Sequence, residues 1–246
     1  APGGRRWQPV GPNGAAGPLA TTAADPRTAA LTTFPALAPW RTEDAGRTWR
    51  QLGRLPVAGG TGTVVVDGRE PRRMWYAVNG STGGALDTVL DPTYQGRLLR
   101  TEDGGRTWQR LDFPDVPVEA LVGDPASRVL VAVTADAVLL SHDRGDHWEA
   151  LPNPLGEPLV GAAVGGEDLY LAGAGGVWAV RGVLGGGDGD GTTVTRVHDA
   201  AAEPLTGLAA DDELLAVLTE DDRVLGSTDG GDTWRELYRV PGGGST

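Results

Sequence analysis

The chain of 246 residues contains no cysteine and no lysine, and it has no long apolar run. Without cysteine there is no disulfide framework, no thiol nucleophile and no thiolate metal ligand. No apolar run approaches the roughly 20 residues that a membrane-spanning helix needs. The 21 basic residues are all arginine and face 33 Asp and Glu, for a net charge of −12. Such a chain lacks the basic surface that nucleic acid requires. We therefore expect no nucleic-acid partner and no integral membrane segment.

The apolar residues of the sequence also show no helical period of about 3.6 residues. Short apolar runs end on turn residues throughout the chain, and 39 Gly and 18 Pro punctuate it. Runs of this length that alternate with turn signals are typical of strands. The sequence therefore predicts an all-β fold.

One eight-residue pattern, Ser/Thr-x-Asp-x-Gly-x-Thr-Trp, occurs four times: at Thr42–Trp49, Thr101–Trp108, Ser141–Trp148 (where His147 replaces Thr) and Ser227–Trp234. The four aspartates are 59, 40 and 86 residues apart. Because the last interval equals two steps of 43 residues, one unit has lost its pattern. Units of about 40–45 residues have the size of a propeller blade.

Each unit reads as four short strands, so we predict a single β-propeller domain over residues 1–246, built of four-stranded antiparallel blades. Five blades fit best, and six are the alternative. The expected blades are 15–58, 59–117, 118–157, 158–200 and 201–240, with a closing strand in 1–14 and a tail at 241–246. The unit without the pattern still offers four strand-like runs, at Leu159–Val164, Asp168–Ala172, Gly176–Arg181 and Thr192–Val197.

Turn chemistry explains why the pattern recurs. The aspartate can accept hydrogen bonds from the backbone that follows it, the glycine can adopt a positive φ, and the tryptophan can fill the space between sheets. We therefore assign structural roles to the following residues: Asp44, Gly46, Trp49, Asp103, Gly105, Trp108, Asp143, Gly145, Trp148, Asp229, Gly231 and Trp234.

The pattern resembles the Asp-box, or BNR repeat, and the dipeptides Asp25-Pro26 and Asp124-Pro125 lie where that family often places its first turn. The resemblance covers nearly the whole chain and implies a β-propeller. Asp-box proteins include sialidases, xyloglucan-active glycoside hydrolases, sorting receptors and photosystem II assembly factors. They are mostly exported, which implies an extracytoplasmic protein, secreted or tethered to the surface.

We expect a binding site on the rim opposite the repeated turns. The aligned inner strands are expected to line the central channel with small neutral residues, and Glu119 is the one charge among the compared positions. The second unit also carries an insertion, Asn79–Gln95, on this rim. Long loops in compact domains are often functional, although a surface loop without function is the equal alternative. The candidate ligand-binding residues are Trp75, Tyr76, Asn79, Asp87, Asp91, Tyr94 and Glu119.

These residues favour a non-catalytic binding module, a monomer without cofactor whose partner is a protein or a glycan. A glycoside hydrolase is the main alternative, with Asp87, Asp91 and Glu119 as candidate carboxylates, and an assembly factor for a membrane complex is another. The sialidase arginine cluster is missing. The three histidines form no triad, and Asp188 and Asp190 bring too few oxygen ligands for calcium, so we expect no metal.

Overall fold

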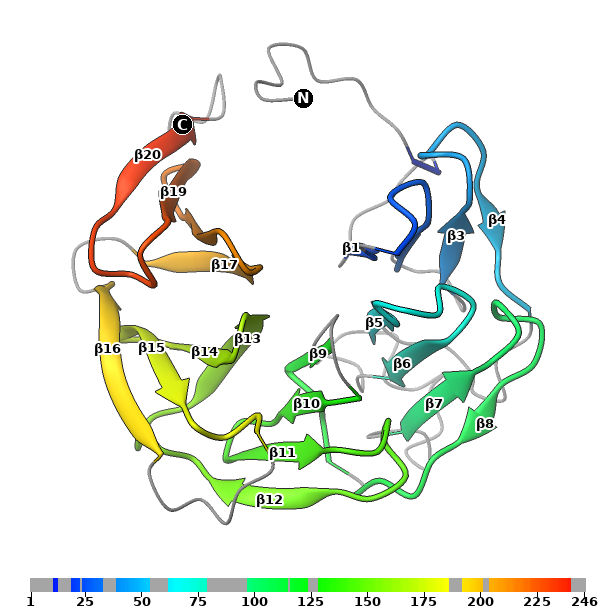
Figure 1. Cartoon of the computed structure of the whole chain (residues 1–246), viewed down its shortest axis with the longest axis horizontal. Coiled ribbons are helices and arrows are strands. Elements are labelled where there is room, and N and C mark those ends of the chain that lie inside the picture. The colour runs from blue at the N-terminus through cyan, green and yellow to red at the C-terminus, as the bar shows by residue number, and fades with distance from the viewer. Residues whose placement is uncertain are drawn as a thin grey trace, which may run out of the picture. The chain divides into compact units, whose positions relative to one another are not determined.

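A computed structural model of the chain describes residues 11–12, 19–22, 24–32, 39–53, 62–78, 97–114, 116–123, 128–185, 192–200 and 204–239. These residues form five antiparallel sheets of four strands each (Figure 1). No described segment forms a helix that is long and apolar enough to cross a membrane. The chain divides into two compact units, residues 1–115 and 116–246.

Unit 1 contains two sheets, which we call blades 1 and 2. In each sheet the strands lie in chain order, so every connection is a hairpin. Blade 1 comprises β1 (Leu19–Thr21), β2 (Ala29–Leu31), β3 (Trp40–Thr42) and β4 (Arg50–Gln51). Blade 2 comprises β5 (Gly62–Val66), β6 (Met74–Val78), β7 (Arg97–Thr101) and β8 (Gln109–Arg110).

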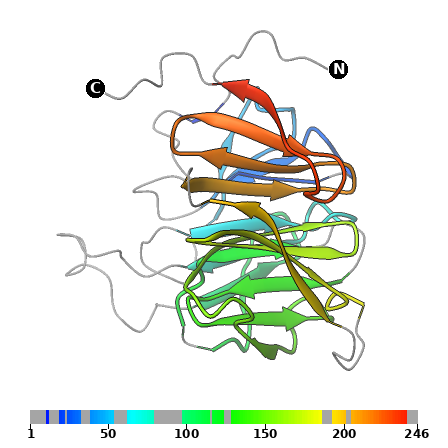
Figure 2. The ribbon, with the colours of Figure 1, turned by 90° about the vertical axis from the view of Figure 1, so that its left-hand side faces the viewer.

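Unit 2 contains three sheets, blades 3 to 5, with the same hairpin order. Blade 3 comprises β9 (Ala120–Gly123), β10 (Leu130–Val133), β11 (Ala137–Ser141) and β12 (Glu149–Pro152). Blade 4 comprises β13 (Leu159–Gly165), β14 (Asp168–Gly173), β15 (Gly176–Arg181) and β16 (Thr193–Asp199). Blade 5 comprises β17 (Leu205–Ala210), β18 (Leu215–Thr219), β19 (Arg223–Ser227) and β20 (Arg235–Arg239). Figure 2 shows the strands of blade 5 side by side, in orange and red.

The predicted fold class, an all-β propeller of five four-stranded antiparallel blades, is confirmed. Blade 4 forms although its unit lacks the repeated pattern, and β15 has the predicted bounds Gly176–Arg181. The expected strand at Thr192–Val197 is β16, which continues to Asp199. The closing strand in 1–14 and the tail at 241–246 lie almost wholly outside the described residues.

Burial decreases from the middle of each sheet to its outer strand. All four residues of β10 are buried, whereas β16 is exposed over most of its length. Apolar clusters join neighbouring blades within each unit. One links blades 1 and 2 through Ala30, Leu52 and Met74, and another links blades 4 and 5 through Tyr170 and Val217. Sheets that are apolar on both faces and solvated at one edge are what stacked blades require.

Candidate functional site

The four repeated segments form one kind of turn, which we call the repeat turn. In the first, the Thr42 hydroxyl donates to Asp44 Oδ1 at 2.8 Å and accepts from the N–H of Gly46 at 2.9 Å. Asp44 also accepts from the backbone N–H and the hydroxyl of Thr48, at 2.9 and 2.6 Å. The other three turns repeat these bonds, with His147 in place of the threonine in blade 3. The predicted role of the aspartate in closing the turn is therefore observed in all four copies.

These hydrogen bonds stabilise the charged carboxylate. The hydroxyl of Thr48 contributes most to lowering the pKa of Asp44 to about 2, and the hydroxyl of Thr233 does the same for Asp229. In blade 3, burial opposes the charge of Asp143, but its bonds to His147 still bring its pKa to about 2. The pKa of Asp103 is lowered as well. A low pKa that arises from satisfied turn bonds indicates a structural carboxylate rather than a proton donor.

The glycine of each repeat turn has a positive φ, as predicted, and so does the residue before it. In blade 1 the pair is Ala45 at 59° and Gly46 at 83°, and in blade 3 it is Arg144 at 68° and Gly145 at 90°. The other two turns place glycine at both positions. The left-handed conformation disfavours side chains, so the turns of blades 1 and 3 carry strain that the others avoid.

The described part of the site expected on the opposite rim consists of three residues. Trp75 and Tyr76 are each only 3% exposed, and burial raises the pKa of Tyr76 to about 12. Tyr76 packs edge-on against Trp108 at 6.4 Å between ring centroids. Both aromatic residues therefore lie in the core of blade 2. Glu119 is exposed just before β9, and its N–H donates to the carbonyl of Val133.

The remaining candidate residues, Asn79, Asp87, Asp91 and Tyr94, lie outside the described residues, as does the whole insertion. Asp188 and Asp190 lie outside them too. Within the described ranges, no group of three or more His, Asp or Glu is placed to hold a metal ion. The ligand-binding role of the insertion therefore stays a prediction.

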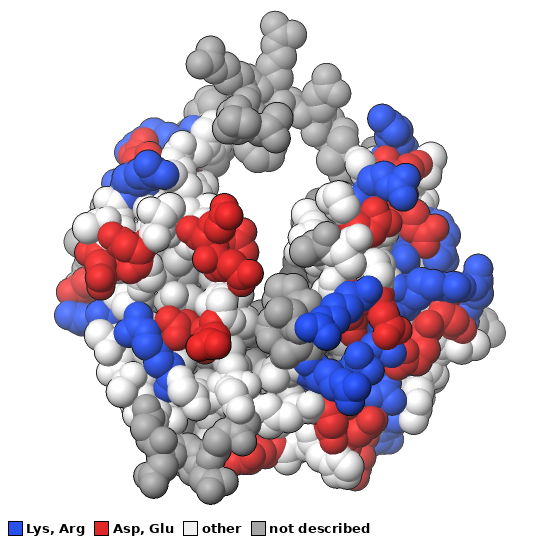
Figure 3. All heavy atoms as spheres, in the orientation of Figure 1, with Lys and Arg blue, Asp and Glu red and all other residues white. Residues whose placement is uncertain are grey.

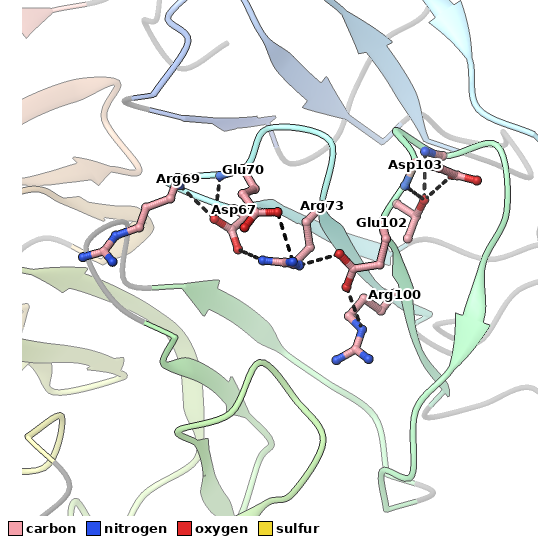
Figure 4. A network of polar contacts seen from close by, with 9 residues as sticks. Asp67, Arg69, Glu70, Arg73, Arg100, Glu102 and Asp103 are labelled. Atoms are coloured by element: carbon pink, nitrogen blue, oxygen red, sulfur yellow. Dashed lines mark hydrogen bonds and ion pairs between the residues drawn. The ribbon is translucent and has the colours of Figure 1, made fainter.

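A charged network occupies the β5–β6 connection of blade 2. The guanidinium of Arg73 contacts Asp67 Oδ2 and Glu70 Oε2 at 3.1 Å and Glu102 Oε2 at 2.7 Å, and Arg100 reaches the same Glu102 (Figure 4). Burial works against the charge of Arg73, but its hydrogen bonds to Glu102 and Asp67 outweigh this and raise its pKa. Three carboxylates pair with Arg73, so we assign the network to the stability of the blade.

A pocket of about 350 Å³ lies between blades 4 and 5. It is lined by the β13–β14 hairpin, the β17–β18 hairpin and the start of the last repeat turn, from Ser227 to Gly230. The pocket therefore lies at the end of the blades that carries the repeat turns, opposite to the end where the sequence analysis places the site. The volume is within the range of sites that hold a small molecule or a few side chains.

Unequal hairpin lengths accompany this pocket. The β13–β14 connection has only two residues, Gly166 and Glu167, whereas the β1–β2 connection of blade 1 has seven, 22–28. In blade 1 the longer connection reaches the next blade, where the Thr22 hydroxyl donates to the carbonyl of Asp67 at 2.9 Å. The short hairpin touches blade 5 through backbone, because a Cβ on Gly165 would lie 2.5 Å from the carbonyl oxygen of Asp211. It leaves the space beside that contact open.

Five acidic residues line the pocket, namely Glu167, Asp168, Asp211, Asp212 and Glu213, and no basic residue does. Three of them have structural bonds. Asp168 contacts Arg181 at 3.0 Å, Asp211 accepts from the N–H groups of Glu213 and Leu214, and Asp212 accepts from the N–H of Gly166 at 3.1 Å. The last bond links the two blades across the pocket. The lining is therefore ordered and strongly negative.

The charge of the pocket is part of a larger asymmetry. Residues 1–115 contain 14 Arg and 11 Asp and Glu, whereas residues 116–246 contain 7 Arg and 22 Asp and Glu. Figure 3 shows arginines interspersed with acidic side chains over unit 1, and mainly acidic side chains over the inner strands of blades 4 and 5. Unit 1 therefore carries a net charge of +3 and unit 2 a net charge of −15, and the negative charge attracts cations to unit 2.

Sequence reasoning missed the pocket residues. A signal for them exists, because Glu167-Asp168 and Asp211-Asp212-Glu213 occupy the same hairpin in consecutive units. Two acidic hairpins at equivalent positions of neighbouring blades must lie close together. The open space between the two hairpins depends on their lengths. These lengths could not be predicted without the strand bounds of both blades.

No protein-family model matches the sequence, and no curated protein matches it. Among solved structures, the chain is similar to YCF48 bound to D1 peptide, with 17% identity, a TM-score of 0.58, and coverage of 89% of this chain and 65% of that one. The GH74 xyloglucanase from Xanthomonas campestris has 19% identity and a TM-score of 0.62, over 89% of this chain and 38% of that one. The nidogen/laminin complex has 12% identity and a TM-score of 0.65, over 89% of this chain and 77% of that one. The chain thus spans less than two thirds of the length of the first and second of these structures. At such identities the likeness shows the propeller fold alone.

Proposed function

We propose that this propeller is a non-catalytic binding module whose partner is a positively charged segment of another protein, received by the pocket between blades 4 and 5. The observation that carries the proposal is this 350 Å³ pocket, which has five acidic residues and no basic residue in its lining. Each basic side chain that enters such a pocket exchanges solvent for carboxylate contacts. The negative charge of unit 2 adds an attraction over longer distances.

Protein and glycan are the partner classes that the sequence favours, and the pocket favours the first. A neutral glycan gains no attraction between net charges from such a pocket, and sugar sites usually offer an exposed aromatic face. The aromatic residue of this lining, Tyr170, is buried. The bonds of Asp168, Asp211 and Asp212 to protein groups also suit a fixed binding surface better than acid–base chemistry.

The similar structures support a binding role by example. In one, a YCF48 propeller is bound to a D1 peptide, and another is the nidogen/laminin complex. We further infer that the repeat turns are Asp-boxes and that the protein works outside the cytoplasm, because the proteins that the motif resembles are mostly exported. A role as an assembly factor for a membrane complex is another form of this function, because the motif resembles that of the photosystem II assembly factors.

The test uses a fluorescent peptide of alternating glycine and arginine and a matched peptide of glycine and glutamate, measured by anisotropy at low and moderate salt. The arginine peptide should bind, and the combined change Asp212→Asn and Glu213→Gln, which keeps side-chain size, should weaken it about tenfold, or about 1.4 kcal/mol. Asp136→Asn, an exposed carboxylate of the β10–β11 turn, is the control and should leave binding unchanged.

Two results would contradict the proposal. One is binding of the arginine peptide to the pocket variant that is no weaker than its binding to the Asp136 variant, which would mean that the pocket carboxylates do not hold the peptide. The other is hydrolysis of xyloglucan that is lost when Asp87 or Asp91 is replaced. That result would establish the glycoside hydrolase that the sequence analysis holds as its main alternative.

A further inference from the structure

Three arginines of unit 1 meet where blade 1 packs on blade 2. Arg41 lies on β3, Arg50 begins β4, and Arg72 belongs to the β5–β6 connection. The guanidinium of Arg50 donates to the carbonyl of Gly104 at 2.9 Å, and the N–H of Gly104 donates to the carbonyl of Arg72 at 2.8 Å. We call these three residues, gathered at the first glycine of the blade 2 repeat turn, the arginine cluster.

The missing side chain of Gly104 brings two of the guanidinium groups next to each other. A Cβ added to Gly104 would lie 3.3 Å from Nη1 of Arg41 and 3.6 Å from Nη2 of Arg50. Donors from two strands of blade 1 therefore flank the same point on the repeat turn of blade 2. Like charges at such short range repel unless an anion lies near them.

Arg41 is buried with incomplete compensation of its charge. Its side chain is only 2% exposed, and its ion-pair partner, Glu43 at 3.1 Å, is 60% exposed. Its Nε has no hydrogen-bond acceptor among the described residues. Burial lowers the pKa of Arg41, and the charges of Arg50 and Arg72 lower it further, against the effects of Glu43 and Asp25. Because a charge removed from water is costly unless its neighbours compensate it, this site favours an added anion.

The other two arginines are accessible to a ligand. Arg50 and Arg72 are exposed, and neither forms an ion pair within the described ranges. With Arg41 and its partner Glu43, the cluster has a net charge of +2. The connections at this end of blades 1 and 2 are described, namely 24–28, 43–49, 67–73 and 102–108.

The junction of blades 4 and 5 has the same arrangement with a carboxylate added. There Nη2 of Arg181 would lie 3.6 Å from a Cβ on Gly230, the first glycine of the next repeat turn. Asp168 is opposite Arg181 in the sheet and pairs with it at 3.0 Å. The residue opposite Arg41 in blade 1 is Ala30. Blade 1 therefore lacks the carboxylate that neutralises the equivalent arginine of blade 4.

We propose that the arginine cluster binds a phosphate group, at a site separate from the acidic pocket of unit 2. Arginine presents planar pairs of N–H donors that match phosphate oxygens. A phosphate monoester carries a charge of about −1.5 to −2 at neutral pH, which balances the cluster better than a single carboxylate does. The phosphate accepts hydrogen bonds from Arg50 and Arg72, and its charge compensates that of the buried Arg41.

Calorimetric titration with inorganic phosphate, at an ionic strength held constant with chloride, tests the site. The wild type should bind one phosphate, and phosphate should raise its thermal midpoint. Arg50→Gln and Arg72→Gln should each weaken binding about tenfold, because each removes a charged donor. Arg47→Gln is the matched control, since it removes another exposed arginine of unit 1, and it should leave binding unchanged.

Arg41→Met separates ligand binding from structural stability. Replacement of a buried charge by an apolar side chain of similar length is often neutral or stabilising. This variant should therefore be as stable as the wild type in chloride and should lose the rise in thermal midpoint that phosphate causes. If it does not fold, the Arg50 and Arg72 variants still decide the matter, because their side chains are exposed.

A peptide with one phosphoserine, compared with its serine form, identifies the source of the phosphate. Tighter binding than that of inorganic phosphate assigns the site to a phosphorylated protein, and otherwise the ligand is free phosphate. Absence of binding by both phosphate probes would overturn the proposal, as would equal affinities of the Arg50, Arg72 and Arg47 variants. The combined variant Asp212→Asn and Glu213→Gln should bind phosphate as the wild type does, so a failure of the acidic pocket and a failure of this site are distinguishable.

Discussion

The first of the two positive-φ residues in each repeat turn offers a direct measure of backbone strain. Blade 5 has Gly230 at 70° and blade 1 has Ala45 at 59°. A Cβ on Gly230 would have its nearest neighbours at 3.6 and 3.7 Å, which is ordinary van der Waals contact. Gly230→Ala therefore changes backbone preference without a clash, and Ala45→Gly makes the reverse change at the equivalent position.

The expected magnitudes follow from two opposing effects. A left-handed residue with a side chain costs about 1–2 kcal/mol, and alanine recovers roughly 0.5–1 kcal/mol of that by restricting the unfolded chain. Gly230→Ala should therefore lower the free energy of unfolding by about 0.5–1 kcal/mol, and Ala45→Gly should raise it by a similar amount. In a chain of this length each kcal/mol moves the thermal midpoint by about 2–4 °C.

Urea and thermal unfolding of the two variants check these values. Gly161→Ala is the control, because its Cβ would also find room, at 3.7 Å from the Cβ of Ala172, while its φ is ordinary. That change should be neutral or stabilising. The reasoning would be refuted if Gly230→Ala matched the control, or if Ala45→Gly destabilised the protein.

Three further changes test the interactions that hold the blades. Arg73→Leu removes the ion pair that Arg73 forms with the buried carboxylate of Asp67 and should cost about 1–3 kcal/mol in urea unfolding. Adding Asp67→Asn to this variant should cost less than Arg73→Leu alone. Trp234→Phe removes the donor to the carbonyl of Val197 and should cost about 1 kcal/mol, measured as a shift in the thermal midpoint. Because the pKa of Asp229 is lowered to about 2, its stabilisation is complete above about pH 4 and is lost as the pH falls to about 2. Asp229→Asn should therefore flatten the acid side of the stability curve, and an unchanged slope would contradict the assignment.

The fold was predictable because the repeat turn combines several local requirements in eight residues. The turn between the third and fourth strands of a blade satisfies all three requirements at once. It uses an aspartate, a glycine at positive φ and a tryptophan at fixed spacing. Blade 4 could be predicted without its turn, because its strands are apolar runs of the right length between flanking units. The positive φ of Ala45 and Arg144 was not predictable, since neither residue type signals that conformation.

The pocket depends on two neighbouring blades together, and the sequence of neither blade alone predicts it. Its width follows from a two-residue β13–β14 connection beside a four-residue one in blade 5, 211–214, and its charge follows from the acidic residues of both. Each hairpin alone reads as an ordinary solvated turn. Only the stacking of one blade on the next makes them walls of the same space, which local patterns of strands and turns do not predict.

The repeat turns and the pocket share one end of the blades, and this has a physical reason. In each blade that has one, the repeat turn is closed by hydrogen bonds to its aspartate, which is Asp44, Asp103, Asp143 or Asp229. In blade 5 the hydrogen-bonded segment from Ser227 to Gly230 forms one wall of the pocket. A preformed wall reduces the entropy that a partner loses on binding. The end that the repeat motif stabilises is therefore suited to recognition, although each residue of the motif is explained by the turn it builds.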